Sequence, residues 1–587
     1  MKTRSVSRHY SLFPLALGAA MAATGAHSAT LTVNTEIDVL NAGDDLCSLR
    51  EAVIAINTAG SEASDCLAEG AYEPGDNTII LPEGTYRLTL PGLDEVPNTS
   101  GIEAPTVDNI PDATIGDLDL IQSMTITGAG SDTTRIEWDP AALTELETDR
   151  IFHIYTTDVN TTNVDVSIQG VTLASGQTFE NNLGIANPTP DTGDSPTYYY
   201  LRRAGGALAL GAAAAVVEVD PNLEGSENAN AGGTGGSTGG EEGGTEYSLS
   251  LSDVVVDGNS AQGDGGGLYL AATTTATNIV VSNNTSGTNG GGLYNEANTT
   301  ITNSTIRDNS AEGGGGMFVT GATPISLTGV TLTGNEAIGG GAISSRSGAT
   351  VNMLNSTISG NLGSDVGGGL YTNGSANLNF VTIARNIANA DSQTAGSGIN
   401  TFPAGGGTVT LKNVLLEGNL AGSDEANRVP ANCGKTGSNT SVASLGYNLS
   451  SDNSCVTNVD WLNDTNDTNN VDPKIEALAD NGGPTLTHAL QEDSPALGAG
   501  IATAGVTTDQ RGEPRDATPD IGAFELPAPE EPIPPEEPTT PTTSSGGGSG
   551  GCTVNPHAPF DPLLPGLVAA AIGGLMLRRQ RRGQKLS

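Results

Sequence analysis

Residues 249–419 repeat one pattern seven times, and this repeat constrains the fold more than any other feature of the sequence. In each copy, apolar positions stand ten, eight, five and three residues before an asparagine, with Thr, Ser or Ala replacing some of them. The closing residues are Asn259, Asn284, Asn309, Asn335, Asn361, Asn386 and Asn419, spaced 25, 25, 26, 26, 25 and 33 residues apart. Such regularity is typical of a solenoid.

The spacing within each copy predicts two short strands that meet at a corner. Apolar residues two apart share one face of a strand, and the three-residue step marks the bend. Asparagine tolerates positive φ and suits the corner, where its amide can also bond to the next coil. Stacked at about 4.8 Å per coil, these repeats predict an all-β, right-handed parallel β-helix of about ten rungs, with an N-terminal capping helix and a C-terminal cap.

Glycine clusters open the next strand in most repeats, as in Gly265–Gly267 and Gly290–Gly292, and indicate turns rather than linkers. An eighth copy of the pattern lies upstream, and an interruption of about residues 177–247 separates it from the regular array. We interpret the interruption as an inserted excursion. It contains an aromatic and basic cluster that is a candidate contact patch, with packing against the helix flank as the alternative: Tyr198, Tyr199, Tyr200, Arg202 and Arg203.

The N-terminus predicts export. Basic residues precede an apolar run that ends in small residues near Ala29, as in a secretory signal peptide. Export permits disulfides, and the cysteines predict two local bridges that flank the array. The expected pairs are Cys47 with Cys66 and Cys433 with Cys455, which leaves Cys552 in the tail.

The C-terminal tail resembles the sorting signals of Gram-negative surface proteins that an intramembrane protease processes. A Pro/Thr/Gly-rich stalk precedes Cys552, and an apolar stretch from Leu563 to Leu577 is followed by a basic end. This resemblance implies processing at Cys552, a C-terminal processing protease as partner, and contact with a membrane through the tail only. The alternative is an uncleaved membrane anchor with a short transmembrane helix.

Residues Cys47 to Ala52 read CSLREA and resemble the signature of the bacterial surface proteins named after that motif. Independently of the resemblance, Ser48 and Glu51 can form a capping box, and the following apolar residues form one stripe of a short helix. Such a helix would protect the open end of the solenoid.

Two further resemblances concern the body of the chain. Residues 481–525, with Asn481 to Thr485 and Asp520 to Glu525, resemble the choice-of-anchor module that precedes sorting tails in the same proteins. The repeats are similar to those of polymorphic outer-membrane proteins, although aliphatic residues replace the usual Phe. No reaction is attached to these motifs.

We therefore expect six segments. They are a signal peptide at 1–29, a cap with the CSLREA motif at 30–115, a β-helix at 116–450, a choice-of-anchor-like cap at 451–526, a stalk at 527–551 and a sorting signal at 552–587.

Few residues are candidates for catalysis or metal binding. Asp257, Arg307 and Asp308 stand within two residues of their corner asparagines and are the catalytic candidates if the chain is an enzyme. We place Arg307 one rung above Asp257 in the same column, which favours an exposed ion pair instead. His153 is expected to be a part-buried strand residue, and no metal-ligand spacing occurs.

Formal net charge is −44, which argues against nucleic acid as a partner. Scattered acids suggest weak Ca²⁺ binding at most, and no cofactor or metal site is predicted. The sequence favours a non-catalytic adhesion or display module at the cell surface or outer membrane, with surface glycans or cell-surface proteins as partners. The alternative is a polysaccharide lyase or glycoside hydrolase of the pectate-lyase-like β-helix class, a hypothesis that rests on fold analogy.

Overall fold

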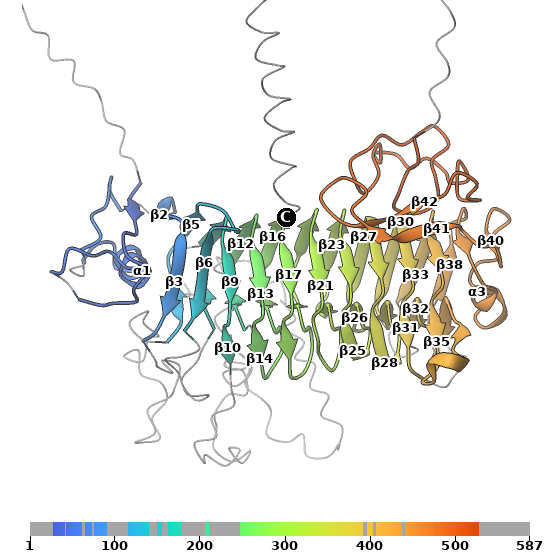
Figure 1. Cartoon of the computed structure of the whole chain (residues 1–587), viewed down its shortest axis with the longest axis horizontal. Helices are drawn as coiled ribbons and strands as arrows, with labels where there is room; N and C mark the ends of the chain where they lie inside the picture. The colour runs from blue at the N-terminus through green and yellow to red at the C-terminus, as the bar shows by residue number, and fades with distance from the viewer. Residues whose placement is uncertain are drawn as a thin grey trace, which may run out of the picture. The chain divides into compact units, whose positions relative to one another are not determined.

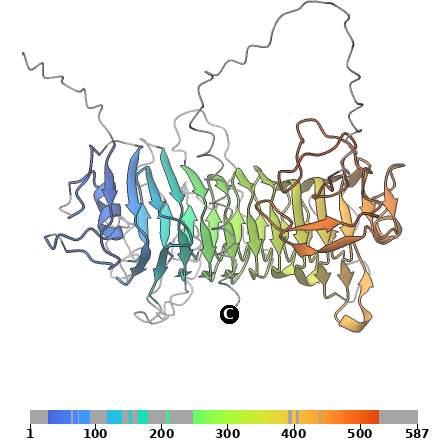
Figure 2. The same cartoon turned by 45° about the horizontal axis from the view of Figure 1, so that its top comes forward.

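The structure is a computed structural model, shown in Figures 1 and 2. It describes residues 28–527 except 42, 62–64, 73–74, 91–115, 140–149, 155–162, 179–205, 211–246, 391–395, 403–406 and 437–440. The signal peptide, the stalk and the sorting signal lie outside the described residues.

Each repeat forms one coil of a parallel β-helix. In the coil that begins at Tyr247, the strands β12 (Tyr247–Ser252), β13 (Val255–Asp257), β14 (Ser260–Ala261) and β15 (Leu268–Leu270) follow one another around the axis. Each pairs in parallel with its counterpart one coil later: β16 (Thr273–Thr277), β17 (Val280–Ser282), β18 (Thr285–Ser286) and β19 (Leu293–Asn295). The predicted parallel β-helix is therefore confirmed.

The strands form three faces, which run the length of the coils. The first face contains β2 (Asn77–Leu81), β5 (Met124–Gly128), β8 (Val164–Gln169), β12, β16, β20 (Thr299–Thr302), β23 (Pro324–Thr328), the first halves of β27 (Thr350–Ser359) and β30 (Ser375–Ala384), β33 (Thr408–Lys412) and β38 (Ser441–Ser444). The second face contains β3 (Gly84–Leu88), β6 (Thr134–Trp138), β9 (Thr172–Ala174), β13, β17, β21 (Thr305–Arg307), β24 (Thr331–Thr333), the second halves of β27 and β30, β34 (Leu415–Glu417), β39 (Leu449–Ser450) and β40 (Thr468–Asn469).

The third face is a separate sheet that contains ten strands among the described residues, which agrees with the prediction of about ten rungs. Its strands are β4 (Leu118–Leu120), β7 (Phe152–Ile154), β11 (Leu208–Leu210), β15, β19, β22 (Met317–Val319), β26 (Ile343–Ser345), β29 (Leu370–Thr372), β32 (Ile399–Thr401) and β37 (Cys433–Lys435). Short strands close the corner between the second and third faces: β10 (Gln177–Thr178), β14, β18, β25 (Glu336–Gly339), β28 (Leu362–Val366), β31 (Ile387–Ala388), β35 (Leu420–Ala421) and β36 (Val429–Pro430).

The repeated apolar residues point inward and form one aliphatic core. In the coil of β12 and β13, Leu249, Leu251, Val254 and Val256 are all at most 2% exposed. Because every coil contributes inward residues at equivalent positions, the interior is continuous along the coils.

One expectation about the corner is wrong. The positive φ angle falls on the residue before each repeated asparagine, such as Gly258 (69°), Asn283 (57°) or Asp308 (57°), and not on the asparagine itself. The repeated asparagine therefore contributes its buried side chain, and the residue before it adopts the left-handed conformation of the turn.

The N-terminal coil is closed by α1 (Leu49–Asn57). Ser48 and Glu51 form the predicted capping box. The predicted Cys47–Cys66 disulfide is confirmed, and it joins the start of α1 to the segment that follows it. β1 (Thr30–Thr32) pairs with β2, and Thr30 exchanges backbone hydrogen bonds with Glu69 on its other side. The outermost strand is therefore not left as an open edge.

The C-terminal coil is closed by residues 451–470. The Cys433–Cys455 disulfide, also as predicted, ties β37 to α3 (Ser454–Thr457). Trp461 and Leu462 are buried against the last coil. A short 3₁₀ helix, η2 (Glu425–Asn427), leads into β36, which pairs antiparallel with β35 and ends that sheet.

Residues 471–526, here called the side module, do not cover the end of the solenoid. They contain the hairpin of β41 (Ile475–Ala479) and β42 (Thr487–Leu490) and lie along the second face, beside β27, β30 and β34 (Figures 1 and 2). Ile475, Leu490, Ile521 and Phe524 pack with Ala384 and Leu415 of the coils in a second hydrophobic cluster. The expected cap at 451–526 is thus two structures, an end cap and a module on the flank.

Among the described residues, no helix has the length and apolar character to cross a membrane. The tail segment for which a short transmembrane helix was predicted is not among them.

Candidate functional site

The seven repeated asparagines form an unbroken internal ladder. Each side-chain Nδ2 donates to the Oδ1 of the next asparagine at 2.9–3.0 Å, from Asn259 to Asn419. Each Nδ2 also donates to a backbone carbonyl of the preceding coil, as Asn335 does to Ile306 O at 2.9 Å. The ladder continues to Asn432, which the repeat spacing did not single out because it follows Asn419 by only 13 residues.

The predicted catalytic residues do not converge. The parallel register places Ser282 between Asp257 and Arg307, so these two lie two coils apart and not one. Asp257 accepts hydrogen bonds from Ser282 Oγ and Asn283 Nδ2, both at 2.7 Å. Arg307 pairs instead with its neighbour Asp308, at 2.7 Å and with both side chains more than 40% exposed. The expected pair of Arg307 with Asp257 is therefore wrong.

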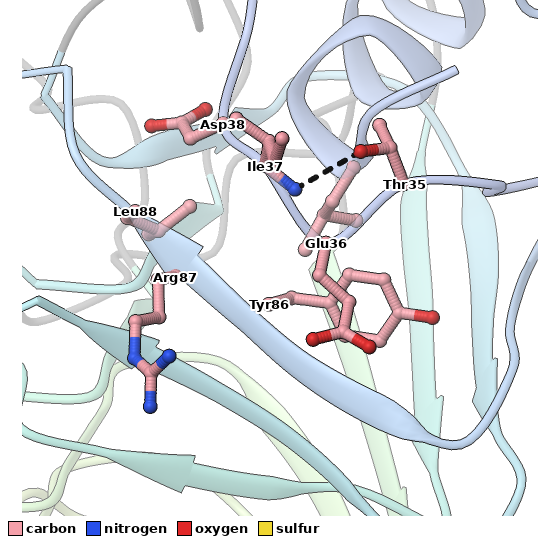
Figure 3. A pocket seen from close by; sticks show the side chains of 8 residues that line it. Thr35, Glu36, Ile37, Asp38, Tyr86, Arg87 and Leu88 are labelled. Atoms are coloured by element: carbon pink, nitrogen blue, oxygen red, sulfur yellow. Dashed lines mark hydrogen bonds between the residues drawn. The ribbon is translucent and has the colours of Figure 1, made fainter. Parts of the chain in front are cut away.

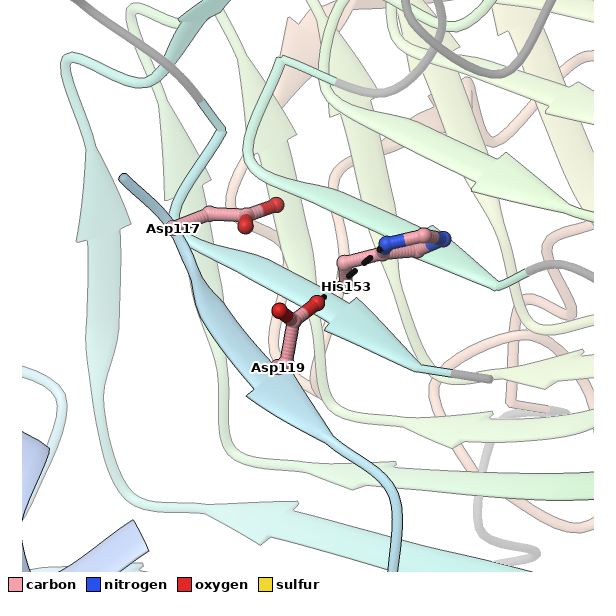
Figure 4. A group of neighbouring side chains, drawn as sticks. All are labelled: Asp117, Asp119 and His153. Carbon is pink, nitrogen blue, oxygen red and sulfur yellow. Dashed lines mark ion pairs between the residues drawn. The ribbon is translucent and has the colours of Figure 1, made fainter. Parts of the chain in front are cut away.

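A buried polar cluster on the third face is the strongest candidate site, and the sequence did not reveal it. Asp119 on β4 lies opposite His153 on β7, with Asp119 Oδ1 3.4 Å from His153 Nδ1 (Figure 4). Asp117 stands just before β4 and pairs with Arg150 at 3.1 Å. Asp117, Asp119 and His153 each offer a ligand atom within 4.8 Å of the others.

Two buried pairs make up this cluster. Arg150 compensates the charge of Asp117, and Asp119 lies against the imidazole of His153. The nitrogen and oxygen donors suit a transition metal, but a cation there would compete with Arg150 for the carboxylate. All four side chains are at most 8% exposed, so the described surface offers a polymer no direct access to them.

Beyond His153, the same outward column of the third face becomes aromatic. Tyr269, Tyr294 and Phe318 stack in parallel, with ring centroids 5.2 and 5.5 Å apart. Their faces are occupied by one another, so they do not form a platform for a sugar ring. The Tyr269 hydroxyl donates to Glu296 at 3.0 Å, and burial raises the pKa of Glu296.

A small hollow lies near the N-terminal cap (Figure 3). Thr35, Glu36, Tyr86 and Arg87 are among its lining residues, and it encloses about 10 Å³. This is room for about one water molecule and not for a sugar or nucleotide. Burial, together with the Glu36 charge, raises the pKa of Tyr86 to about 12.

The CSLREA residues build the N-terminal cap and show no catalytic arrangement. Arg50 is fully buried and donates to both oxygens of Asp38, at 2.7 and 3.1 Å. It also donates to the backbone carbonyls of Gly116 and Asp117, which lead into β4. The arginine of the motif therefore connects the capping helix to the first strand of the third face.

Polar contacts hold the side module to the coils. His488 on β42 lies between Ser359 Oγ, 2.9 Å from Nε2, and the Glu476 carbonyl, 2.8 Å from Nδ1. Because a carbonyl can only accept, Nδ1 carries the proton and Nε2 accepts from Ser359. Arg515 lies 3.9 Å from the ring centroid of Phe380 and pairs with buried Glu525 at 2.9 Å.

The candidate contact patch Tyr198, Tyr199, Tyr200, Arg202 and Arg203, and the predicted processing residue Cys552, lie outside the described residues. Their roles stay predictions.

No protein-family model matches the chain, and no curated protein matches it. Among solved structures, pectate lyase Pel9A is similar at 10% identity and a TM-score of 0.39, over 76% of this chain and 88% of that one. The A-module of Azotobacter vinelandii mannuronan C-5 epimerase AlgE6 is similar at 13% identity and a TM-score of 0.31, over 69% and 89%. Similarity at this level transfers no activity, and the parallel β-helix follows from the strand pairing of the chain itself.

Proposed function

We propose that the chain is a non-catalytic module that a Gram-negative bacterium displays on its surface for adhesion. The observation that carries this proposal is the continuous asparagine ladder inside coils that are closed at both ends. Each amide is committed to its neighbours, and such a network favours one rigid arrangement over many. Rigidity along the coils is what a displayed binding surface requires, because little entropy is then lost on contact.

The proposal includes the chain's export and anchoring. It places the chain among the CSLREA-motif and choice-of-anchor surface proteins, processed at Cys552 by a membrane protease, without cofactor and with weak Ca²⁺ binding at most. Surface glycans or cell-surface proteins are the proposed partners.

A polysaccharide lyase or hydrolase is the second candidate. The observation in its favour is the cluster of His153, Asp119 and Arg150, which combines an acid–base pair with a cation on one sheet face. The burial of that cluster weighs against it.

Retention of cells under flow tests the adhesion proposal. Cells that carry the full chain should be retained on glycan-coated surfaces better than cells without it. A variant lacking residues 285–335 loses two whole repeats and joins Asn284 to Glu336, so the ladder register is kept. Detection of this variant at the cell surface with an antibody is the control for its folding. Equal retention of cells with and without the full chain would contradict the proposal.

A further inference from the structure

The first face has an outward surface made of small hydroxyl side chains. In β12, β16, β20 and β23, alternate residues point inward to the core and the others outward. Apart from Pro324 at the start of β23, the outward residues are Ser248, Ser250, Ser252, Thr273, Thr275, Thr277, Thr300, Thr302, Ser326 and Thr328. We call this set the hydroxyl face.

The hydroxyl face is arranged as a lattice because the strands pair in parallel without a shift. Ser250 is opposite Thr275, which is opposite Thr300, which is opposite Ser326. A second column runs from Ser252 through Thr277 and Thr302 to Thr328. Neighbouring hydroxyls are therefore about 4.8 Å apart along the solenoid and about 6.6 Å apart along a strand.

The hydroxyls of the central column are available to solvent. Ser250, Thr275 and Thr300 are exposed, and within the described part of the chain their hydroxyls make no hydrogen bond. The situation changes further along the same face, where Asn377 bonds to Asn352 and Thr410 bonds to Asn377, both at 2.8 Å. Within the described residues, the central column is thus free of side-chain hydrogen bonds from β12 to β23, whereas Ser248 and Ser252 on either side of it donate to Asp165 and Asp253.

The hydroxyl face is also neutral, although the whole chain carries a net charge of −44. None of its ten residues is charged or aromatic, and the nearest charges are the carboxylates of Asp165 and Asp253 at its edges, which accept from Ser248 and Ser252. A charged partner would find no complementary group there, and a sugar polymer would find no ring to stack on. The partner that fits is an uncharged periodic array of hydrogen-bonding groups.

The other two faces do not offer such a lattice. From Thr331 onward the second face is covered by the side module, as the bond from Thr331 Oγ1 to Leu486 O shows. The third face bears the buried Asp119–His153 pair and the aromatic stack.

We propose that the hydroxyl face binds ice. The surface of ice is a flat, uncharged lattice of hydrogen-bonding oxygens, and the face presents hydroxyls at fixed intervals in two directions. Threonine adds a methyl group beside each hydroxyl, which fills space between water molecules. The asparagine ladder fixes the coils beneath this face, so binding costs little conformational entropy. The inference names a partner for the proposed adhesion module. The biological use of ice binding rests on that proposed function, whereas ice binding itself does not.

Partitioning into ice tests the proposal with the purified full-length chain. When a polycrystalline ice mass grows slowly in the solution, the chain should be enriched in the ice relative to a protein of similar size without such a face. Thr300→Arg places a long charged side chain in the centre of the lattice and should lower this enrichment roughly tenfold, equivalent to about 1.4 kcal/mol.

Thr305→Arg is the matched control. Thr305 lies in the same coil, on β21 of the second face, also pointing outward. It should partition like the unchanged chain, and thermal unfolding of both variants checks that the fold is kept. The proposal is overturned if the unchanged chain is excluded from ice, or if the two variants behave alike.

The nearest rival partner of the hydroxyl face is a neutral crystalline polysaccharide. Binding to cellulose distinguishes this partner from ice. Retention on cellulose that Thr300→Arg abolishes, together with exclusion from ice, would also overturn the ice proposal. Failure of the ice test is independent of the cell-retention test on glycans, so the adhesion role and its proposed partner are judged separately.

Discussion

Substitution of Asn335 by leucine should destabilise the coils strongly, because Asn335 lies in the middle of the ladder. Its Oδ1 accepts from Asn309 Nδ2 at 2.9 Å and from the Asn309 backbone N–H at 3.1 Å. Its Nδ2 donates to Asn361 Oδ1 and to Ile306 O, each at 2.9 Å. All these groups are buried in the solenoid.

The magnitude follows from the groups left without a partner. Leucine removes the acceptor for two donors of Asn309 and the donor to Ile306 O, whereas Asn361 Oδ1 keeps the backbone N–H of residue 335 at 3.0 Å. Each buried unsatisfied group costs about 1–3 kcal/mol, so three of them cost about 3–9 kcal/mol. Burial of the leucine side chain returns about 2 kcal/mol. We therefore expect a net loss of about 1–7 kcal/mol in the free energy of unfolding.

Guanidinium unfolding followed by circular dichroism measures this loss. Asn298→Leu is the control, since Asn298 is an exposed asparagine in a neighbouring coil whose side chain makes no hydrogen bond among the described residues. It should change the free energy of unfolding by about 0.5 kcal/mol or less. If Asn335→Leu shifts the midpoint no more than Asn298→Leu does, the ladder does not stabilise the fold as argued.

Three further outcomes follow from the structure. Burial lowers the pKa of His488 from 6.5 to about 4. As the pH falls, the imidazole therefore takes up a proton in the unfolded chain before it does so in the folded chain. Docking of the side module should weaken by about 2 kcal/mol between pH 7.5 and 5 for this reason. Hydrogen exchange of the β42 amides should show this loss, and His488→Gln should remove it; equal pH profiles would contradict the assignment. Arg50→Met leaves the Asp38 carboxylate buried without its ion pair and should cost about 3–5 kcal/mol in thermal unfolding, with partial recovery in the double variant Arg50→Met/Asp38→Leu. If the tail is a processed sorting signal, mass spectrometry of surface protein should find residues 578–587 absent, and Cys552→Ala should alter maturation.

The sequence predicts what depends on local periodicity. The spacing of the apolar residues and asparagines sets the strand, the corner and the ladder, because each coil repeats the same short-range geometry. The disulfides could be paired because their cysteines are near in sequence and flank the array. The capping box was evident because Ser48 and Glu51 stand three residues apart.

The candidate site depends on contacts that no periodicity encodes. Asp119 and His153 meet through strand register across 34 residues of irregular sequence, so neither residue stands out in the chain. The side module docks through contacts between residues that are far apart in the sequence, such as Ser359 with His488, 129 residues apart. Counting equivalent positions through successive repeats would have placed Ser282 between Asp257 and Arg307. A comparison of outward residues coil by coil would also have revealed the hydroxyl face.

Turnover of polysaccharides tests the central claim most directly. The purified full-length chain is incubated with a panel of acidic and neutral polysaccharides, with and without Ca²⁺, and both new reducing ends and unsaturated products are measured. A non-catalytic module predicts no product above the buffer control. Product that disappears in His153→Ala, Asp308→Asn or Arg307→Ala, while circular dichroism of the variant is unchanged, would contradict the account and establish a β-helix lyase or hydrolase.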